Sequence, residues 1–355
     1  GAVKDFSKPG KKLNMANPIL RSSKQLQPYD GLFGFNRQQC FNGTMFRLPF
    51  RTSPSEISST MYSKHTIDEM VSDLIECSSE LILFLRHIAK ITFCSIEADS
   101  STPQVLVEIE KTSQQCEGNV LSTITTRENG GSPSSKMWLV CTSEEGTSGK
   151  QRTGSVACSL QMQDGGYRVQ RCTGETFCFL PLSNSTGLPV HVSANFAVMT
   201  NRRGIWAEDS HTSHSTTESQ WNVQLMETVI PMAYYSMLVG LKRLEQEGKL
   251  TSYVFHSLWP LEKELEQQHP WTACIAALYR MISTGELMYS HTTSQWLSIK
   301  DSRFIAPAIF AVSSAHSDTP RCIIEAIEGL NIPVVDLPLK YHSCLPLEQS
   351  TITEQ

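Results

Sequence analysis

The stretch that decides the fold is F-C-F-L-P-L-S-N-S-T-G-L-P-V-H-V-S-A-N-F-A-V-M-T-N-R-R-G-I-W, residues 177–206. Its first part predicts a strand that starts at Phe177 and ends at a cluster of turn formers, residues 183–187. A second strand follows, with apolar residues at period two on one face: Val190, Val192, Ala194, Phe196 and Val198. The other face of this strand carries His191, Ser193, Asn195 and Ala197.

Two adjacent arginines, Arg202 and Arg203, follow the second strand in a loop, before the chain returns to apolar residues at Ile205 and Trp206. Two guanidiniums on a loop that leaves a buried strand are well placed to bind an anion. They are the candidate catalytic residues. The alternative is that both are solvated loop side chains.

Composition places the chain among soluble globular proteins. It has 355 residues, 40% of them hydrophobic and 18% charged, and a net charge of −5. A weakly acidic chain of this length is not expected to bind nucleic acid or an anionic membrane, and no apolar run approaches the roughly 18 residues of a membrane span. The eleven cysteines form no C-x-x-C pair, so we expect reduced, buried thiols and a cytoplasmic location. Because the chain begins with Gly1, we expect it to be a piece of a longer protein.

The pattern along the chain predicts an α+β protein with three domains, 1–100, 101–206 and 207–355. Residues 66–88 predict one or two amphipathic helices, with a capping box at Thr66 and Glu69. Short β segments from residue 104 onward, with a tight turn at 164–166, predict an antiparallel meander. Helices are predicted at 221–244, with a kink at Pro231, and at 257–269 and 271–282. A small terminal α/β unit is predicted from strands at 309–312 and 332–336 and a helix at 320–330.

Several familiar motifs fail on inspection. The segment Gly146–Lys150 resembles a phosphate-binding loop, but Glu144 stands at its first glycine position and Gln151 follows the lysine. His211 and His214 have a spacing that suits a metal, but no third ligand lies nearby in the sequence, so a solvated loop is preferred. No metal site is predicted.

Three blocks of sequence resemble the large repeats of the sacsin family. They are F-C-F-L-P-L with the following T-G-L-P-V-H-V to I-W segment, G-T-M-F-R-L-P-F-R at 43–51, and Trp221-Asn222 with the helix after it. The blocks agree in order and spacing, and the resemblance extends from about Leu32 to the C-terminus.

This resemblance implies the end of a nucleotide-binding domain similar to that of heat shock protein 90 and the GHKL ATPases, followed by a middle-like region. In such a domain, Gly43 and Thr44 would close the site near the nucleotide phosphates, and residues 46–50 would be a central strand of the sheet. Arg202 and Arg203 would lie where a middle domain presents a cation to the terminal phosphate. The implied cofactors of a full-length protein are ATP and magnesium, with none bound by this chain alone.

The GHKL catalytic glutamate, magnesium-binding asparagine and D-x-G-x-G motif would lie upstream of Gly43, and the preceding residues do not contain them. The first hypothesis is therefore a chaperone module, not an enzyme by itself, that binds polypeptide clients, neighbouring repeats and the heat shock protein 70 system. The second is the rear half of an ATPase, and the third is a structural scaffold without clients.

Overall fold

The computed structural model describes residues 18, 24, 26–39, 41–56, 58–97, 100, 102–116, 118–129, 131–146, 151–202, 204–206, 217–252, 255–265, 268–290, 292–305, 332–347 and 351–352. The predicted strand at 309–312 and helix at 320–330 lie outside them, as do Arg203, His211 and His214. The chain forms two compact units, each described here by itself. The first comprises Gly1–Glu76, Thr92–Glu108 and Arg127–Ser132, and the second comprises Cys77–Ile91, Ile109–Thr126 and Pro133–Gln355. The three-domain division stays a prediction.

The first unit combines two 3-10 turns, η1 (Gln27–Tyr29) and η2 (Leu32–Gly34), with the helix α2 (Lys64–Glu76). The predicted capping box is wrong in its position. The first turn of α2 is capped by Ser63, whose Oγ accepts a hydrogen bond from the Thr66 N–H at 3.2 Å.

Residues 46–50 do not form the predicted strand. This segment is irregular, and the side chains of Phe46 and Leu48 are 84% and 83% exposed. A strand needs a neighbour that receives its backbone hydrogen bonds. The described contacts of this segment are instead local: the Tyr62 N–H donates to the Arg51 carbonyl at 3.1 Å, and the Phe50 and Tyr62 rings lie 5.1 Å apart.

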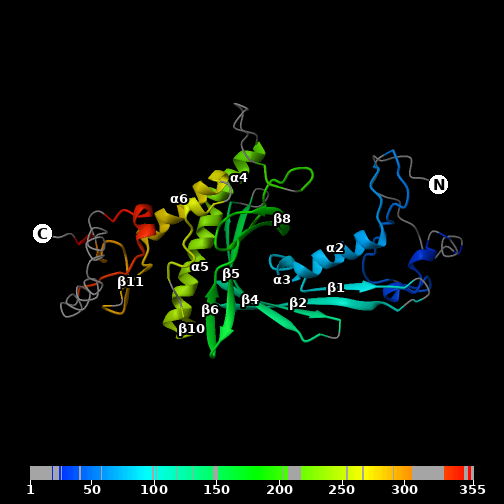
Figure 1. The fold of residues 1–355 in the computed structure, drawn as a ribbon, viewed down its shortest axis with the longest axis horizontal. Helices are drawn as coiled ribbons and strands as arrows, with labels where there is room; N and C mark the ends of the chain where they lie inside the picture. Colours follow the sequence, from blue (N-terminus) through cyan, green and yellow to red (C-terminus); the bar gives the residue numbers. More distant parts are fainter. Residues whose placement is uncertain are drawn as a thin grey trace. The chain divides into compact units, whose positions relative to one another are not determined.

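The predicted meander is confirmed as the centre of a ten-stranded sheet (Figure 1). Its order is β1-β2-β3-β4-β5-β9-β7-β8, with β6 paired to β5 and to β10. The strands are β1 (Lys90–Ser95), β2 (Gln104–Cys116), β3 (Asn119–Glu128), β4 (Ser134–Glu145), β5 (Arg152–Gln163), β6 (Gly166–Gln170), β7 (Glu175–Cys178), β8 (Leu180–Ser185), β9 (His191–Ala194) and β10 (Leu250–Ser252). Most neighbours are antiparallel, while β7 pairs with β9, and β10 with β6, in parallel. The coarse prediction of an α+β fold with an antiparallel sheet therefore holds.

Two turns in this sheet show how local sequence sets topology. Asp164 and Gly165 both have positive φ, 49° and 83°, and join β5 to β6 as a two-residue hairpin, as predicted. The decisive stretch contains one turn more than predicted. Phe179, with φ of 66°, separates β7 from β8, and β9 then enters the sheet between β5 and β7.

The main core lies between one sheet face and the helices α4 (Thr217–Glu227), α5 (Val229–Gln246) and α6 (Gln268–Thr284). The predicted period-two face of β9 is confirmed, since its residues are buried in this core: Val190, Val192, Ala194 and Phe196. Helix α5 crosses β5 at Gly154, where a Cβ would come within 3.0 Å of the Ile230 backbone nitrogen. A side chain at this position would therefore displace the helix.

The long helix predicted at 221–244 is two helices, because the chain breaks at Thr228, where φ is −122° and ψ is −85°. Pro231 lies in the first turn of α5, where its missing N–H has no helical acceptor in any case. None of the described helices is long and apolar enough to cross a membrane.

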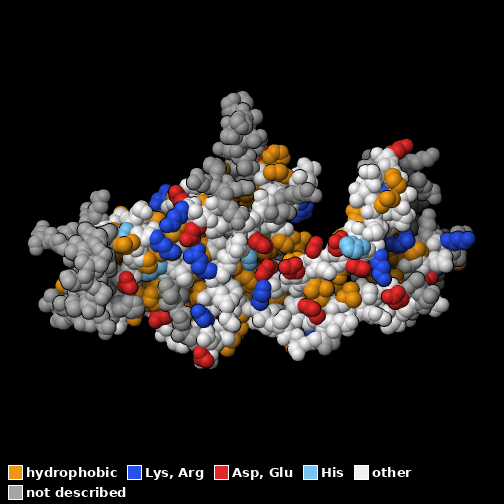
Figure 2. Space-filling view, in the orientation of Figure 1, with side chains coloured by type: hydrophobic (Ala, Val, Ile, Leu, Met, Phe, Trp, Pro, Cys, Tyr) orange, Lys and Arg blue, Asp and Glu red, His pale blue; other side chains and the backbone are white. Residues whose placement is uncertain are grey.

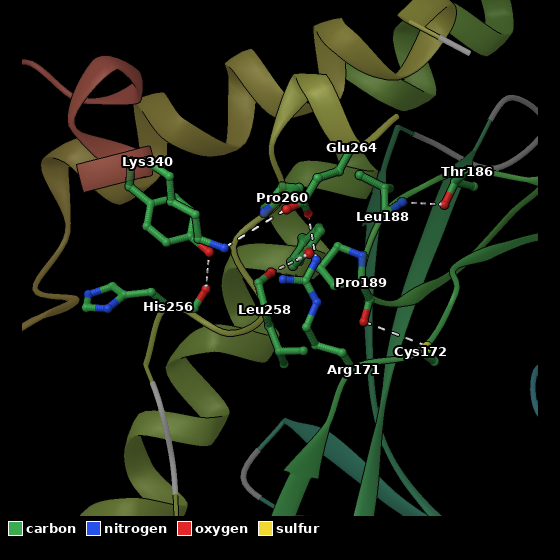
Figure 3. Close-up of polar contacts among 12 residues, drawn as sticks. Arg171, Cys172, Thr186, Leu188, Pro189, His256, Leu258, Pro260, Glu264 and Lys340 are labelled. Carbon is green, nitrogen blue, oxygen red and sulfur yellow. Dashed lines mark hydrogen bonds and ion pairs between the residues drawn. The ribbon is translucent and has the colours of Figure 1, made fainter. Parts of the chain in front are cut away.

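The helix predicted at 257–269 is wrong. Residues 256–260 form turns and irregular chain, and a short 3-10 turn, η3 (Glu262–Glu264), follows them. Three tyrosine hydroxyls donate to alternate carbonyls of this segment: Tyr341 to His256 at 2.7 Å, Tyr234 to Leu258 at 2.6 Å, and Tyr279 to Pro260 at 2.9 Å. Figure 3 shows this segment with the Arg171–Glu264 ion pair beside it, which closes at 2.7 Å. These hydrogen bonds satisfy carbonyls that have no helical partner and so stabilise the non-helical path of the segment.

The C-terminal part contains two small sheets, β11 (Met288–Ser290) with β12 (Gln295–Leu297) and β13 (Phe304–Ile305) with β14 (Thr351–Ile352), and the 3-10 turn η5 (Leu339–Cys344). The predicted strand at 332–336 contributes single bridges, from Val335 to Ser290 and from Val334 to Arg303.

A second, smaller apolar layer covers the opposite face of the sheet, and His191 lies inside it. Its ring centroid is 5.4 Å from that of Phe177 and 5.0 Å from that of Trp138, and Phe177 in turn contacts Phe84 at 4.9 Å. His191 is 3% exposed, and its Nδ1 accepts the Glu175 N–H at 3.1 Å. Burial lowers the pKa of His191 to about 4.

We predict that His191 makes the fold sensitive to acid. The unfolded chain binds this proton near pH 6.5 and the folded chain only near pH 4, so stability is complete above 6.5 and falls as the pH drops through this window. The loss is on the order of 3 kcal/mol across the window. His191→Asn keeps an acceptor for the Glu175 N–H but does not titrate. Urea unfolding from pH 7.5 to 4.5 checks this, and equal pH slopes for the two proteins would contradict it.

Candidate functional site

Arg202 lies at the tip of a hairpin that follows β9. Val198 and Ile205 form an antiparallel bridge, the Met199 N–H donates to the Gly204 carbonyl at 2.9 Å, and the Trp206 N–H donates to the Ala197 carbonyl at 3.0 Å. The loop between them is closed further by the Arg202 N–H, which donates to the Met199 carbonyl at 2.8 Å. The predicted loop after the strand is thus a defined hairpin, and Arg203 lies outside the described residues.

The backbone of Arg202 is in the left-handed region, with φ of 54°, and the residue is exposed. A non-glycine residue in this region is uncommon and costs on the order of 1 kcal/mol. The positive charge of Arg202 acts on the Cys178 thiol at the end of β7. Burial raises the pKa of Cys178, and Arg202 opposes that rise.

Asn222 on α4 fixes this hairpin by three hydrogen bonds to backbone. Its Oδ1 accepts the Ala197 N–H at 2.8 Å, and its Nδ2 donates to the carbonyls of Ala197 and Trp206, each at 2.8 Å. The Asn222 side chain is 2% exposed. A side-chain amide carries a donor nitrogen and an acceptor oxygen on separate atoms, so it bonds both strands of the hairpin at once.

A second set of hydrogen bonds lies beside the first and involves Trp221, next to Asn222, and Asn195, two residues before Ala197. Trp221 donates from Nε1 to the Asn195 carbonyl at 2.9 Å. The Asn195 side chain accepts the Thr153 N–H at 2.9 Å and donates to the Gln151 carbonyl at 2.8 Å. These contacts join the start of β5, the end of β9 and helix α4. The Trp221-Asn222 block and the A-N-F-A-V block, which carry the family resemblance separately in sequence, thus contact each other directly.

Gly43 and Thr44 lie in the first unit, on an exposed and irregular segment. Gly43 has φ of 145°, a conformation that glycine adopts without strain. Within the part of the chain that the structure describes, no other group engages the Thr44 hydroxyl. A backbone amide and a hydroxyl with these properties suit a phosphate oxygen, but they are two groups and not a pocket. Their nucleotide role stays a prediction.

Gly43 and Thr44 belong to one compact unit and Arg202 belongs to the other. Over the described residues, no group of three or more His, Cys, Asp and Glu side chains could hold a metal ion. Sequence reasoning missed Asn222 as a functional anchor. The only signal available was its place in a family-like block, since the three backbone groups that it binds are 16 and 25 residues away.

Comparison with known proteins agrees with the resemblance that the three sequence blocks indicated. The model of the family described as "Sacsin domain" matches residues 2–108. Human sacsin is 26% identical over an alignment of 452 positions that covers 95% of this chain. Because the alignment is longer than the chain, the human protein has insertions relative to it. The chain spans about a tenth of the length of human sacsin. No solved structure matches. The predicted resemblance to sacsin is therefore confirmed along nearly the whole chain.

We predict that Asn222→Ala lowers the free energy of unfolding by about 2 kcal/mol, because three hydrogen bonds are lost and the Ala197 N–H and Trp206 carbonyl lose their partner. Gln220→Ala is the matched control, since it removes an exposed amide from the same helix and should change stability by less than about 0.5 kcal/mol. Urea unfolding of both variants measures the difference. If the two variants were equally stable, the Asn222 clamp would not hold the hairpin.

Proposed function

We propose that this sacsin-related chain is a protein-binding module of a cochaperone, related to heat shock protein 90, that holds non-native polypeptide. A holding function needs apolar surface that stays exposed in the folded protein and is mixed with polar groups that keep it soluble. It needs no chemistry on the client.

The observation that carries this proposal is the exposed apolar row at Phe46, Leu48 and Phe50. These side chains are 84%, 83% and 49% exposed, and Arg47 alternates with them. Met61 is also exposed, at 54%, in the same compact unit. Monomeric proteins rarely leave large apolar side chains together in water unless they bind something. The row lies inside the segment that matches the Sacsin domain model.

We predict that the chain, at a molar ratio of one to one, suppresses the aggregation of a thermally unfolded client enzyme, measured by light scattering. The double variant Phe46→Ser, Leu48→Ser should lose at least roughly half of this suppression, because it removes the largest exposed apolar side chains of the row. Met162→Ser is the control, since Met162 is 57% exposed on β5 in the other compact unit.

Complete failure to suppress aggregation would remove the holding function, and the scaffold hypothesis would replace it. If the Met162→Ser control lost as much suppression as the double variant, any exposed apolar side chain would bind the client. The row would then not be the specific client-binding surface. The heat shock protein 70 system and neighbouring repeats belong to the same proposal as partners, and they follow from the resemblance alone. A cytoplasmic location belongs to it too, and rests on the resemblance and on the pattern of cysteines.

A second candidate function is the rear half of a GHKL ATPase. It is supported by the left-handed backbone of Arg202, which stores strain at a cationic tip, and by the positive φ of Gly43 beside a hydroxyl. The described residues do not fit a complete ATP–magnesium pocket, because these groups are exposed and have no convergent acidic ligands. Thr44 and Arg202 would supply at most single contacts to phosphate oxygens.

We therefore predict that this chain alone binds magnesium–ATP with a Kd of about 1 mM or weaker. Isothermal titration calorimetry measures this Kd. Thr44→Val and Arg202→Ala should leave the titration unchanged. Saturable binding that both substitutions weaken would favour the ATPase hypothesis over the holding module.

A further inference from the structure

A groove in the second unit lies between α6, η3 and the C-terminal turn η5, and has a volume of about 760 Å³. Its floor is apolar, with Leu261 and Ile275 buried and Ala276 and Pro346 exposed at the surface. Tyr279 lies under the same floor, with its hydroxyl turned away to the Pro260 carbonyl. The polar group of this tyrosine is therefore already satisfied, and its buried ring supports the floor from below.

The length of the groove suits a helix. Five positions of α6 line it: Ile275, Ala276, Tyr279, Arg280 and Ser283. They lie on one face of the helix and extend over nine residues, or eight steps of 1.5 Å, which is about 12 Å. A second helix of about two turns, with apolar side chains three and four residues apart, covers such a distance.

The rim of the groove is basic, although the chain as a whole has a net charge of −5. Lys263, Arg280 and Lys340 line it together with a single carboxylate, Glu262. Among the described residues, no carboxylate forms an ion pair with Lys263 or Arg280. Lys340 lies 4.0 Å from Glu264, which already pairs with Arg171 at 2.7 Å (Figure 3). Figure 2 shows Lys and Arg side chains gathered over the part of the molecule where Figure 1 draws α6.

We propose that this groove binds an acidic amphipathic helical segment of a partner polypeptide. The apolar floor would take the hydrophobic side chains of the segment, and the three cations would face its flanking Asp and Glu residues. Charge complementarity of this kind selects partners and speeds association more than it adds affinity. The inference rests on the proposed protein-binding function and names the class of partner that this surface selects.

The test uses the full 355-residue chain and two fluorescent 16-residue peptides. Both carry leucines at the same i, i+3, i+4 and i+7 positions, and their remaining positions are either Glu or Lys. Fluorescence anisotropy should show saturable binding of the acidic peptide only, weakened by added salt. The double variant Lys263→Glu, Arg280→Glu should weaken it at least tenfold.

Lys300→Glu is the matched control, because it reverses an exposed charge outside the groove and should leave binding within about twofold. Ala276→Trp, which fills the apolar floor without changing charge, should also abolish binding. Melting temperatures show that the variants fold. Equal binding of the two peptides, or an unchanged Kd in the double variant, would overturn the proposal.

Aggregation suppression separates this proposal from the function on which it rests. If the chain suppresses client aggregation but the peptide assay fails, the holding function stands and the groove assignment falls. If the acidic peptide binds in the groove but no client is held, the groove stands as a specific docking site and the holding function falls.

Discussion

Three tyrosine hydroxyls that bind alternate carbonyls fix the path of the chain between helices α5 and α6. Tyr234 comes from α5, Tyr279 from α6 and Tyr341 from η5, and they bind the carbonyls of Leu258, Pro260 and His256. Each hydroxyl is buried, so leaving either partner unsatisfied would cost about 1–3 kcal/mol. Burial raises the pKa of Tyr234 and of Tyr279, so both remain donors at physiological pH. Between the bound carbonyls, Trp259 packs its ring 5.6 Å from Tyr341 and 6.1 Å from Tyr279. This segment thereby ties three elements that are distant in sequence to one another.

The same constraint builds the wall of the groove beside α6. Because Pro260 is held by Tyr279, the chain reaches Leu261 and Lys263 at a set distance from the helix. Glu264 then anchors η3 to Arg171, directly after β6. The polar groups of these side chains therefore bind backbone carbonyls or each other within the fold. Lys263 and Arg280 line the rim, and their side chains form no ion pair with a described carboxylate, so they take no part in this framework.

Much of the sheet could be predicted from sequence, because its signals are local. The period-two pattern from Val190 to Phe196 gave the correct buried face, and Asp164-Gly165 gave the correct hairpin. The failures share one physical cause, since the deciding partner lies far along the chain. The apolar residues of 257–269 suggested a helix, but Tyr341, 85 residues from His256, binds the carbonyl that a helix would use. The place of β9 between β5 and β7 likewise depends on pairing between distant strands.

At the candidate site, too, residues distant in sequence determine the geometry. Sequence drew attention to Arg202, the exposed cation, but the hairpin that carries it is fixed by Asn222, whose buried amide binds both strands. Arg202 itself sits in a backbone conformation that costs energy, and such a conformation persists only when its surroundings determine it. Asn222, Trp221 and Asn195 supply that determination through six hydrogen bonds to backbone groups. These hydrogen bonds fix the base of the hairpin, so two residues of helix α4, distant in sequence, determine where the backbone that carries Arg202 leaves the sheet.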